Sequence, residues 1–150
     1  MTFYPISMSK ISDFVEAALA DSTNAHNEFE LGIMPPFQGQ AISQSTGIIS
    51  IAGASKILTA HAIRHAFVRH GGPAKAGQSE IPLMIEDFNF LAHILSSPDT
   101  VIKGDTQNRK KNQVLKFTKV IKGATYNVLM SIVRSRESTT LVFNTMYINK

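Results

Sequence analysis

The chain has 150 residues, a usual length for one domain, and its lack of cysteine excludes disulfides, thiolate nucleophiles and cysteine-ligated zinc. No apolar run approaches the roughly 18 residues that span a bilayer, so we expect no membrane partner, and the start, MTFYPISMSK, lacks the features of a signal peptide. The net charge of +4 excludes no class of partner by itself, because the charge is distributed unevenly along the chain.

The first 47 residues predict one helix and one short strand. Apolar residues recur at helical spacing after Ser9, which can cap a helix that stops near Asp21. The alternating segment Glu28–Met34 predicts a strand, which Pro35-Pro36 ends. The following segment, Phe37–Gly47, is rich in Gln, Ser and Gly, and we expect a loop there.

The middle of the chain predicts two helices. After a short strand at Gly47–Ala52, Ser55 can cap a helix from Lys56 to about His70, where Gly71-Gly72-Pro73 stops it. A second helix is expected over Ile85–Ser96, and Ser97-Pro98-Asp99 ends it.

The last third changes to a period of two residues, which is typical of strands. We expect strands at Thr100–Gly104, Val114–Ile121, Tyr126–Val133 and Thr139–Ile148, joined by short polar turns. Short turns make consecutive strands antiparallel, so these four form a meander. With the helices packed on one face of this four-stranded sheet, the fold class is α+β.

The same C-terminal third carries the positive charge. Residues 1–100 contain 5 Lys/Arg against 9 Asp/Glu, a balance of −4, and residues 101–150 contain 10 against 2, a balance of +8. A concentrated positive segment attracts polyanions, chiefly because binding releases counterions from phosphates. The alternative is a solvated basic face that only keeps the protein soluble.

The helix expected over residues 56–70 is rich in histidine. His61, His65 and Arg69 are spaced at i, i+4 and i+8, so they lie on one stripe of the helix, and His70 follows at its end. A cation near a helix C-terminus is stabilised by the helix dipole, so each histidine alone has a structural explanation. Three histidines and two arginines within ten residues favour a functional role.

A metal site is not expected on this helix. His61 and His65 have a spacing that can hold zinc, but the glutamate of an HExxH motif is missing. A third ligand would have to come from His26, His93 or a distant carboxylate. We therefore expect neither a metal nor another cofactor.

These residue types suit cleavage of RNA by its own 2′-hydroxyl. That reaction needs a base, an acid and cations on the phosphate, and needs no metal. The helix offers the histidines, and the strands offer Lys116, Lys119, Thr145 and Tyr147. The basic residues predicted to bind RNA, together with His61, are Arg109, Lys110, Lys111, Lys116 and Lys119.

Three segments resemble a known family. HAIRHAFVRHG, a later helix ending in SSPDTVI, and a basic meander closing with NTMYINK resemble the phage-associated nuclease domains of the BECR superfamily (barnase-, EndoU-, colicin- and RelE-like folds). The matching residues are His65 with Arg69-His70-Gly71, Pro98-Asp99 and Thr145-Met146-Tyr147. The resemblance covers about residues 47–150, so the single domain divides into an extension at 1–46 and a nuclease core at 47–150.

The resemblance implies a metal-independent endoribonuclease that acts as a toxin or phage effector, with tRNA as a candidate substrate and an immunity or antitoxin protein as a candidate partner. His65 or His70 would be base or acid, Arg69 would hold the phosphate, and Thr145 and Tyr147 would line the site. We therefore expect a cytoplasmic location: such a protein acts in a bacterial cytosol, either where it is made or after delivery.

Two alternatives remain open. The basic sheet could hold RNA or an acidic partner protein without chemistry, which a salt-dependent shift of intact RNA would indicate. The protein could also be an effector that blocks a host factor, with structural histidines. Copurification of a host protein without any change in RNA would favour that reading.

Overall fold

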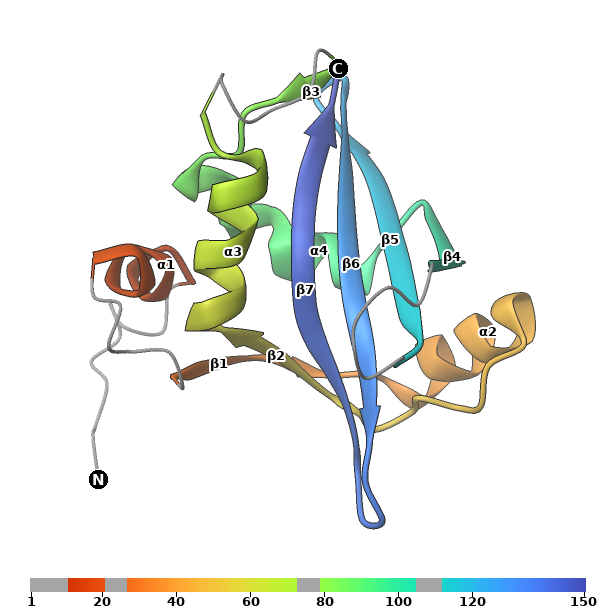
Figure 1. The fold of residues 1–150 in the computed structure, drawn as a ribbon. Coiled ribbons are helices and arrows are strands. Elements are labelled where there is room, and N and C mark those ends of the chain that lie inside the picture. Colours follow the sequence, from red (N-terminus) through yellow and green to blue (C-terminus); the bar gives the residue numbers. More distant parts are fainter. Residues whose placement is uncertain (1–10, 21–26, 73–78, 105–111) are drawn as a thin grey trace.

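The computed structural model describes residues 11–20, 27–72, 79–104 and 112–150, and it confirms the α+β class. Its mixed sheet of seven strands has the order β1-β2-β7-β6-β5-β4, with β3 also paired to β7. The expected four-stranded sheet was therefore too small. Figure 1 shows the long strands β5–β7 standing together at the centre, with helices beside and behind them.

The C-terminal strands lie next to one another in chain order. β4 (Thr100–Gly104), β5 (Val114–Ile121), β6 (Ala124–Arg134) and β7 (Thr139–Asn149) pair antiparallel with their sequence neighbours. Lys122 and Gly123, both with positive φ, form the turn between β5 and β6. Alternating side chains and the short turns that follow β5 and β6 are enough to produce most of this half of the sheet, which is why the sequence predicts it well.

The other half of the sheet comes from earlier in the chain. β1 (Glu28–Ile33) pairs antiparallel with β2 (Ser55–Thr59), and β2 pairs parallel with the start of β7. β3 (Glu80–Ile81) pairs with the end of β7. Since β1 belongs to this sheet, residues 28–33 extend the same sheet as the strands after residue 47.

The expected helix over residues 56–70 was wrong in its first turn. Residues 55–59 form β2, and helix α3 begins at Ala60 and ends at His70. Thr59, in place of Ser55, is the N-cap, and its side chain accepts a hydrogen bond from the Ala62 amide. The segment SKILT joins the sheet because it finds partners on both sides, in β1 and β7.

Two further expectations in this region were wrong. Residues 36–46 form helix α2 (Pro36–Thr46) where a loop was expected, and residues 47–52 form no strand. Pro36 starts the helix without losing a bond, because the first helical amide has no partner in the helix. Gly39 allows close approach, since a Cβ there would lie 2.7 Å from the Ala52 backbone nitrogen.

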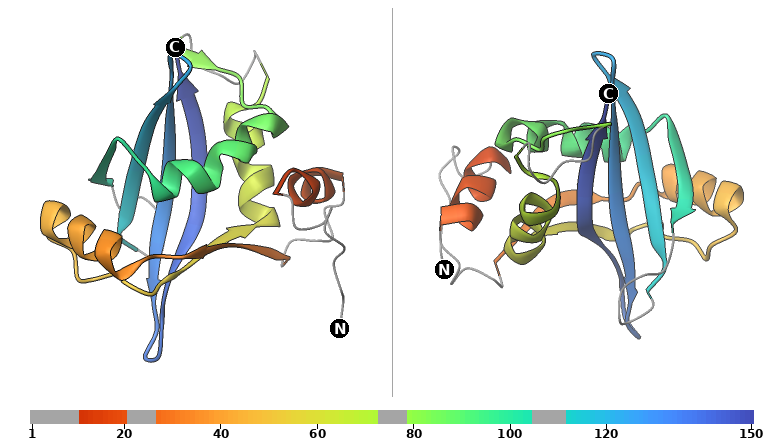
Figure 2. Two further views of the ribbon diagram at one scale, coloured as in Figure 1. Left: turned by 180° about the vertical axis from the view of Figure 1, so that it is seen from behind. Right: turned by 45° about the horizontal axis from the view of Figure 1, so that its top comes forward.

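One face of the sheet is covered by the segment expected to be a helix over residues 85–96. It forms a 3₁₀-helix, η3 (Ile85–Phe90), followed by α4 (Leu91–Ser96). Figure 2 shows this segment lying across the strands when the molecule is seen from behind. The buried side chains between the two layers include Phe88, Leu91, Ile94, Leu95, Phe117, Val128, Met130, Phe143 and Met146.

Helix α1 (Ile11–Ala20) packs against α3 and η3 at the side of the molecule. It buries Val15 and Ala18, and the Arg64 guanidinium of α3 donates a hydrogen bond to the Ala18 carbonyl at the end of α1. Arg64 is therefore occupied in holding two helices together. None of the helices that the structure describes is long and apolar enough to cross a membrane.

Candidate functional site

Helix α3 occupies a gap beside strand β7. β2 pairs with residues 140–142 of β7 and β3 pairs with residues 148 and 149, so no described strand pairs with this side of residues 143–147. α3 runs alongside this stretch (Figure 1). The helix therefore brings His65 and Arg69 close to the middle of β7.

The face of the sheet opposite η3 and α4 presents two short rows of side chains. Ile102, Lys116, Leu129 and Thr145 are cross-strand neighbours, one from each of the four strands β4 to β7. Tyr147 lies two residues beyond Thr145 and therefore on the same face. Of these five side chains, Lys116 is charged and the other four are apolar or carry a hydroxyl group.

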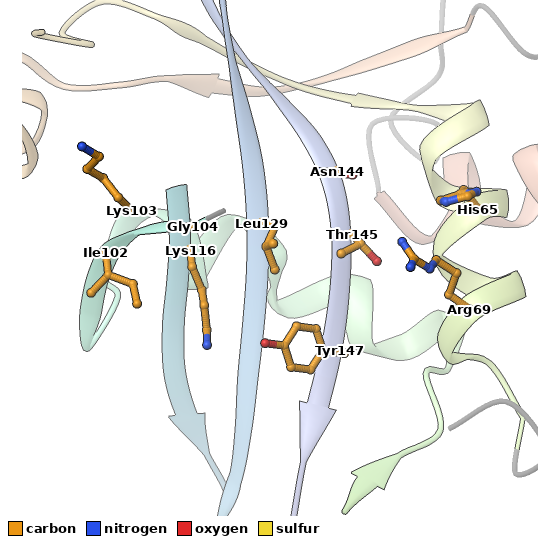
Figure 3. A pocket seen from close by; sticks show the side chains of 10 residues that line it. All are labelled: His65, Arg69, Ile102, Lys103, Gly104, Lys116, Leu129, Asn144, Thr145 and Tyr147. Carbon is orange, nitrogen blue, oxygen red and sulfur yellow. The ribbon is translucent and has the colours of Figure 1, made fainter. Parts of the chain in front are cut away.

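Helix and sheet together enclose a hollow of about 640 Å³. Figure 3 shows His65 and Arg69 on α3 beside Thr145 and Tyr147 of β7, with Lys116 farther across the sheet. Among its lining residues in the described part of the chain, there are cationic side chains and no carboxylate. A hollow with this charge suits an anion. Its lining residues are His65, Arg69, Ile102, Lys103, Gly104, Lys116, Leu129, Asn144, Thr145 and Tyr147.

Thr145 has a hydroxyl group without a partner among the described residues. The residue is 8% exposed, and its Oγ1 is buried without a hydrogen bond. Buried polar atoms are nearly always hydrogen-bonded, so an exception in a hollow indicates a bond made to something that enters it. In Figure 3 the Arg69 side chain extends toward Thr145. The Arg69 side chain and the Thr145 hydroxyl therefore face the same part of the hollow.

His70 lies next to this hollow and does not line it. Its Nδ1 is 3.1 Å from Oε2 of Glu80 in β3, and the imidazole packs against the Tyr147 ring with 5.5 Å between centroids. The Lys116 ammonium also lies 5.9 Å from the centroid of Tyr147. Tyr147 is thus held by two positively ionisable groups, and Glu80 orients the His70 ring.

The structure brings most of the residues predicted from the sequence together. His65, Arg69, Lys116, Thr145 and Tyr147 line the hollow, although they come from three separate elements. The His61 ring lies beside that of His65, with 6.4 Å between centroids and 18° between planes.

Lys119, which was also predicted from the sequence to bind RNA, lies on the other face of the sheet. It stands three positions after Lys116 and thus on the covered face of β5. Its ammonium donates to the Ser97 carbonyl at 2.7 Å and lies 3.6 Å from Asp99. The Val120 amide, followed by Lys119, lowers the pKa of the Asp99 carboxyl. Arg109, Lys110 and Lys111 lie outside the described residues.

Sequence reasoning missed Glu80 and Asn144. Glu80 is an isolated acidic residue in a two-residue strand, and no motif connects it to His70. Asn144 lies inside the last expected strand, where nothing in the composition distinguishes it from its neighbours. Only the register of β6 against β7 singles it out.

No group of three or more His, Asp or Glu side chains converges within the described ranges 11–20, 27–72, 79–104 and 112–150. His93, considered from the sequence as a third ligand, is exposed on α4 at the opposite face, and His26 lies outside these ranges. The other described residues that line a hollow together with His61 and His65 are apolar or carry hydroxyl or amide groups, and none of them is a carboxylate.

Comparisons with protein-family models, with curated proteins and with solved structures found no match for this chain. The geometry of the hollow is therefore the basis for assigning a function.

Proposed function

We propose that this protein is a metal-independent endoribonuclease that cleaves RNA through attack by the 2′-hydroxyl. The observation that carries the proposal is the hollow between α3 and the sheet, which Arg69, Lys116 and His65 line together with Thr145, whose hydroxyl has no partner among the described residues. Two cations suit a phosphodiester, and an imidazole suits proton transfer near neutral pH.

In this mechanism the scissile phosphate lies between Arg69 and Lys116, where the Thr145 hydroxyl donates to one of its oxygens. Both cations stabilise the extra negative charge of the transition state, and this stabilisation is often the largest contribution to catalysis. His65 removes the proton from the 2′-hydroxyl, and the 2′-oxygen forms a bond to phosphorus. The bond to the 5′-oxygen breaks, and this oxygen takes a proton from the Tyr147 hydroxyl. The products are a 2′,3′-cyclic phosphate and a 5′-hydroxyl.

His70 has a positioning role in this scheme, because it lies behind the Tyr147 ring and is bound to Glu80. We extend the proposal to the biology implied by the resemblance to BECR-superfamily nucleases. The protein would act in a bacterial cytosol as a toxin or phage effector, with tRNA as a substrate and an immunity or antitoxin protein as a partner.

The test is cleavage of purified tRNA by the wild-type protein in EDTA, followed by analysis of the fragment ends. We expect fragments with cyclic phosphates, and a loss of rate of about 10²- to 10⁴-fold in His65→Ala, the range typical of a general base. The matched control is His93→Ala, since His93 is exposed on α4 at the opposite face of the sheet. Equal rates in the two variants would show that His65 is not the base.

A second candidate is an RNA-binding module without chemistry. It is favoured by the observation that His65 is the one imidazole among the residues that line the hollow in the described part of the chain. On this alternative, wild-type protein shifts RNA in a salt-dependent manner and the RNA stays intact in every condition.

A further inference from the structure

A second hollow of about 470 Å³ continues from the first along α3 and β7. The two hollows share the lining residues His65 and Asn144. When one group of a ligand binds in the first hollow, the adjacent group of the same ligand therefore lies beside the second hollow. The remaining side of the second hollow is formed by the first turn of α3 and by residues 131 and 133 of β6. Its lining residues are Thr59, His61, Ala62, His65, Asn112, Ser131, Val133, Val142, Phe143 and Asn144.

The chemistry of the second hollow differs from that of the first. Among its lining residues in the described part of the chain there is no Lys, Arg, Asp or Glu. Val133 and Val142 give it an apolar floor, and the nearly parallel rings of His61 and His65 give it an aromatic wall. A flat, uncharged group with polar edges suits such a surface, whereas a phosphate suits the first hollow.

Asn144 stands where the two hollows meet, and it is the extra residue of a β-bulge. Leu129 of β6 pairs with Thr145, but the next residue, Met130, pairs with Phe143, so Asn144 has no partner across the ladder. Bulges are frequent beside functional sites because they redirect a side chain. Among the described residues, the Asn144 side-chain amide takes part in no hydrogen bond, so its donor and acceptor are available to a ligand.

We propose that the second hollow is a nucleobase subsite, in which the base next to the scissile phosphate packs on His61 and His65 and Asn144 reads its edge. The inference rests on the proposed function, since the phosphate in the first hollow fixes which base enters the second. An asparagine amide can donate and accept in one plane, so it pairs with a base edge that offers the complementary pattern. The base contact makes the protein selective for one nucleotide at that position.

The experiment measures the dissociation constants of the four nucleoside 3′-monophosphates and of ribose phosphate by titration calorimetry. We expect the best nucleotide to bind at least about tenfold more tightly than ribose phosphate, because stacking and edge contacts each contribute appreciably. His61→Ala should reduce this ratio to about threefold or less, and His61→Phe, which keeps a ring, should retain more of it. In Asn144→Ser, the four nucleotides should have similar dissociation constants.

His93→Ala is the control for loss of an exposed histidine, and thermal melting establishes that each variant is folded. The inference is overturned if nucleotides bind no more tightly than ribose phosphate, or if the ratio is the same in His61→Ala as in the control. If the protein cleaves RNA but no nucleotide binds more tightly than ribose phosphate, the proposal of a nucleobase subsite is refuted and the proposal of a nuclease is kept. If the wild type binds none of the ligands and cleaves no RNA, both proposals fail.

Discussion

Strand β5 contains two lysines that give a matched test of which face of the sheet holds RNA. Lys116 lines the hollow, and Lys119, three residues later, lies on the covered face near Ser97 and Asp99. Replacing either lysine with glutamine removes one positive charge from the same strand. The two variants therefore change the net charge equally and differ in the face that they affect.

The expected magnitude follows from counterion release. A lysine that contacts one phosphate of a single-stranded RNA contributes about 0.7 to the slope of the logarithm of the binding constant against the logarithm of salt concentration. Lys116→Gln should lower the steepness of that slope by about 0.7, so over a fourfold rise in salt the variant loses about 2.5-fold less affinity than the wild type. Lys119→Gln should leave the slope unchanged, because its ammonium is bound within the protein.

The assay is fluorescence anisotropy of a labelled single-stranded RNA at several salt concentrations, with a 2′-O-methyl group at each position to prevent cleavage. A slope that changes equally in both variants would show that only overall charge matters. A slope that changes in Lys119→Gln alone would place the RNA on the other face of the sheet, and the reasoning about the hollow would be refuted.

Three further predictions concern stability in urea. Tyr126→Phe should lower the free energy of unfolding by about 1–2 kcal/mol, because the hydroxyl donates to Asp87 at 2.8 Å. Burial, with Asp87, raises the pKa of Tyr126 to about 12, so this contribution is complete below about pH 10 and should vanish as the pH rises through 12. Burial lowers the pKa of Lys56, so the unfolded chain holds the Lys56 proton more tightly than the folded protein does. Lys56→Met should therefore raise the free energy of unfolding by about 1 kcal/mol at pH 7. This gain should shrink as the pH rises toward 10.5, because Lys56 then loses its charge in both states. Gly39→Ala should lower the free energy of unfolding, because a clash with the Ala52 backbone costs about 1–3 kcal/mol and the gain in helix propensity is about 1 kcal/mol. For each of the three variants, a urea midpoint equal to that of the wild type would contradict the prediction.

Local patterns account for the parts of the fold that the sequence predicts. The strands β4–β7 follow from alternating side chains and short turns, and the segment of residues 85–96 follows from its helical spacing of apolar residues. Helix α2 escaped prediction because it buries only Gly39 and Ile42, so it carries almost no apolar periodicity. Strand β2 was assigned to a helix because its partners, residues 28–33 and 140–142, are distant in the sequence.

The sequence by itself determined the residue types and their local spacing. It places His61, His65 and Arg69 on one helical stripe, and it places lysines and hydroxyl-bearing residues on strands whose side chains alternate between two faces. Period-two alternation already puts Lys116 and Lys119 on opposite faces. Only the tertiary structure decided which face stays open, because that depends on where η3 and α4 pack. The pairing of His70 with Glu80 and the bulge at Asn144 were decided in the same way, since both depend on contacts between elements that no local pattern encodes.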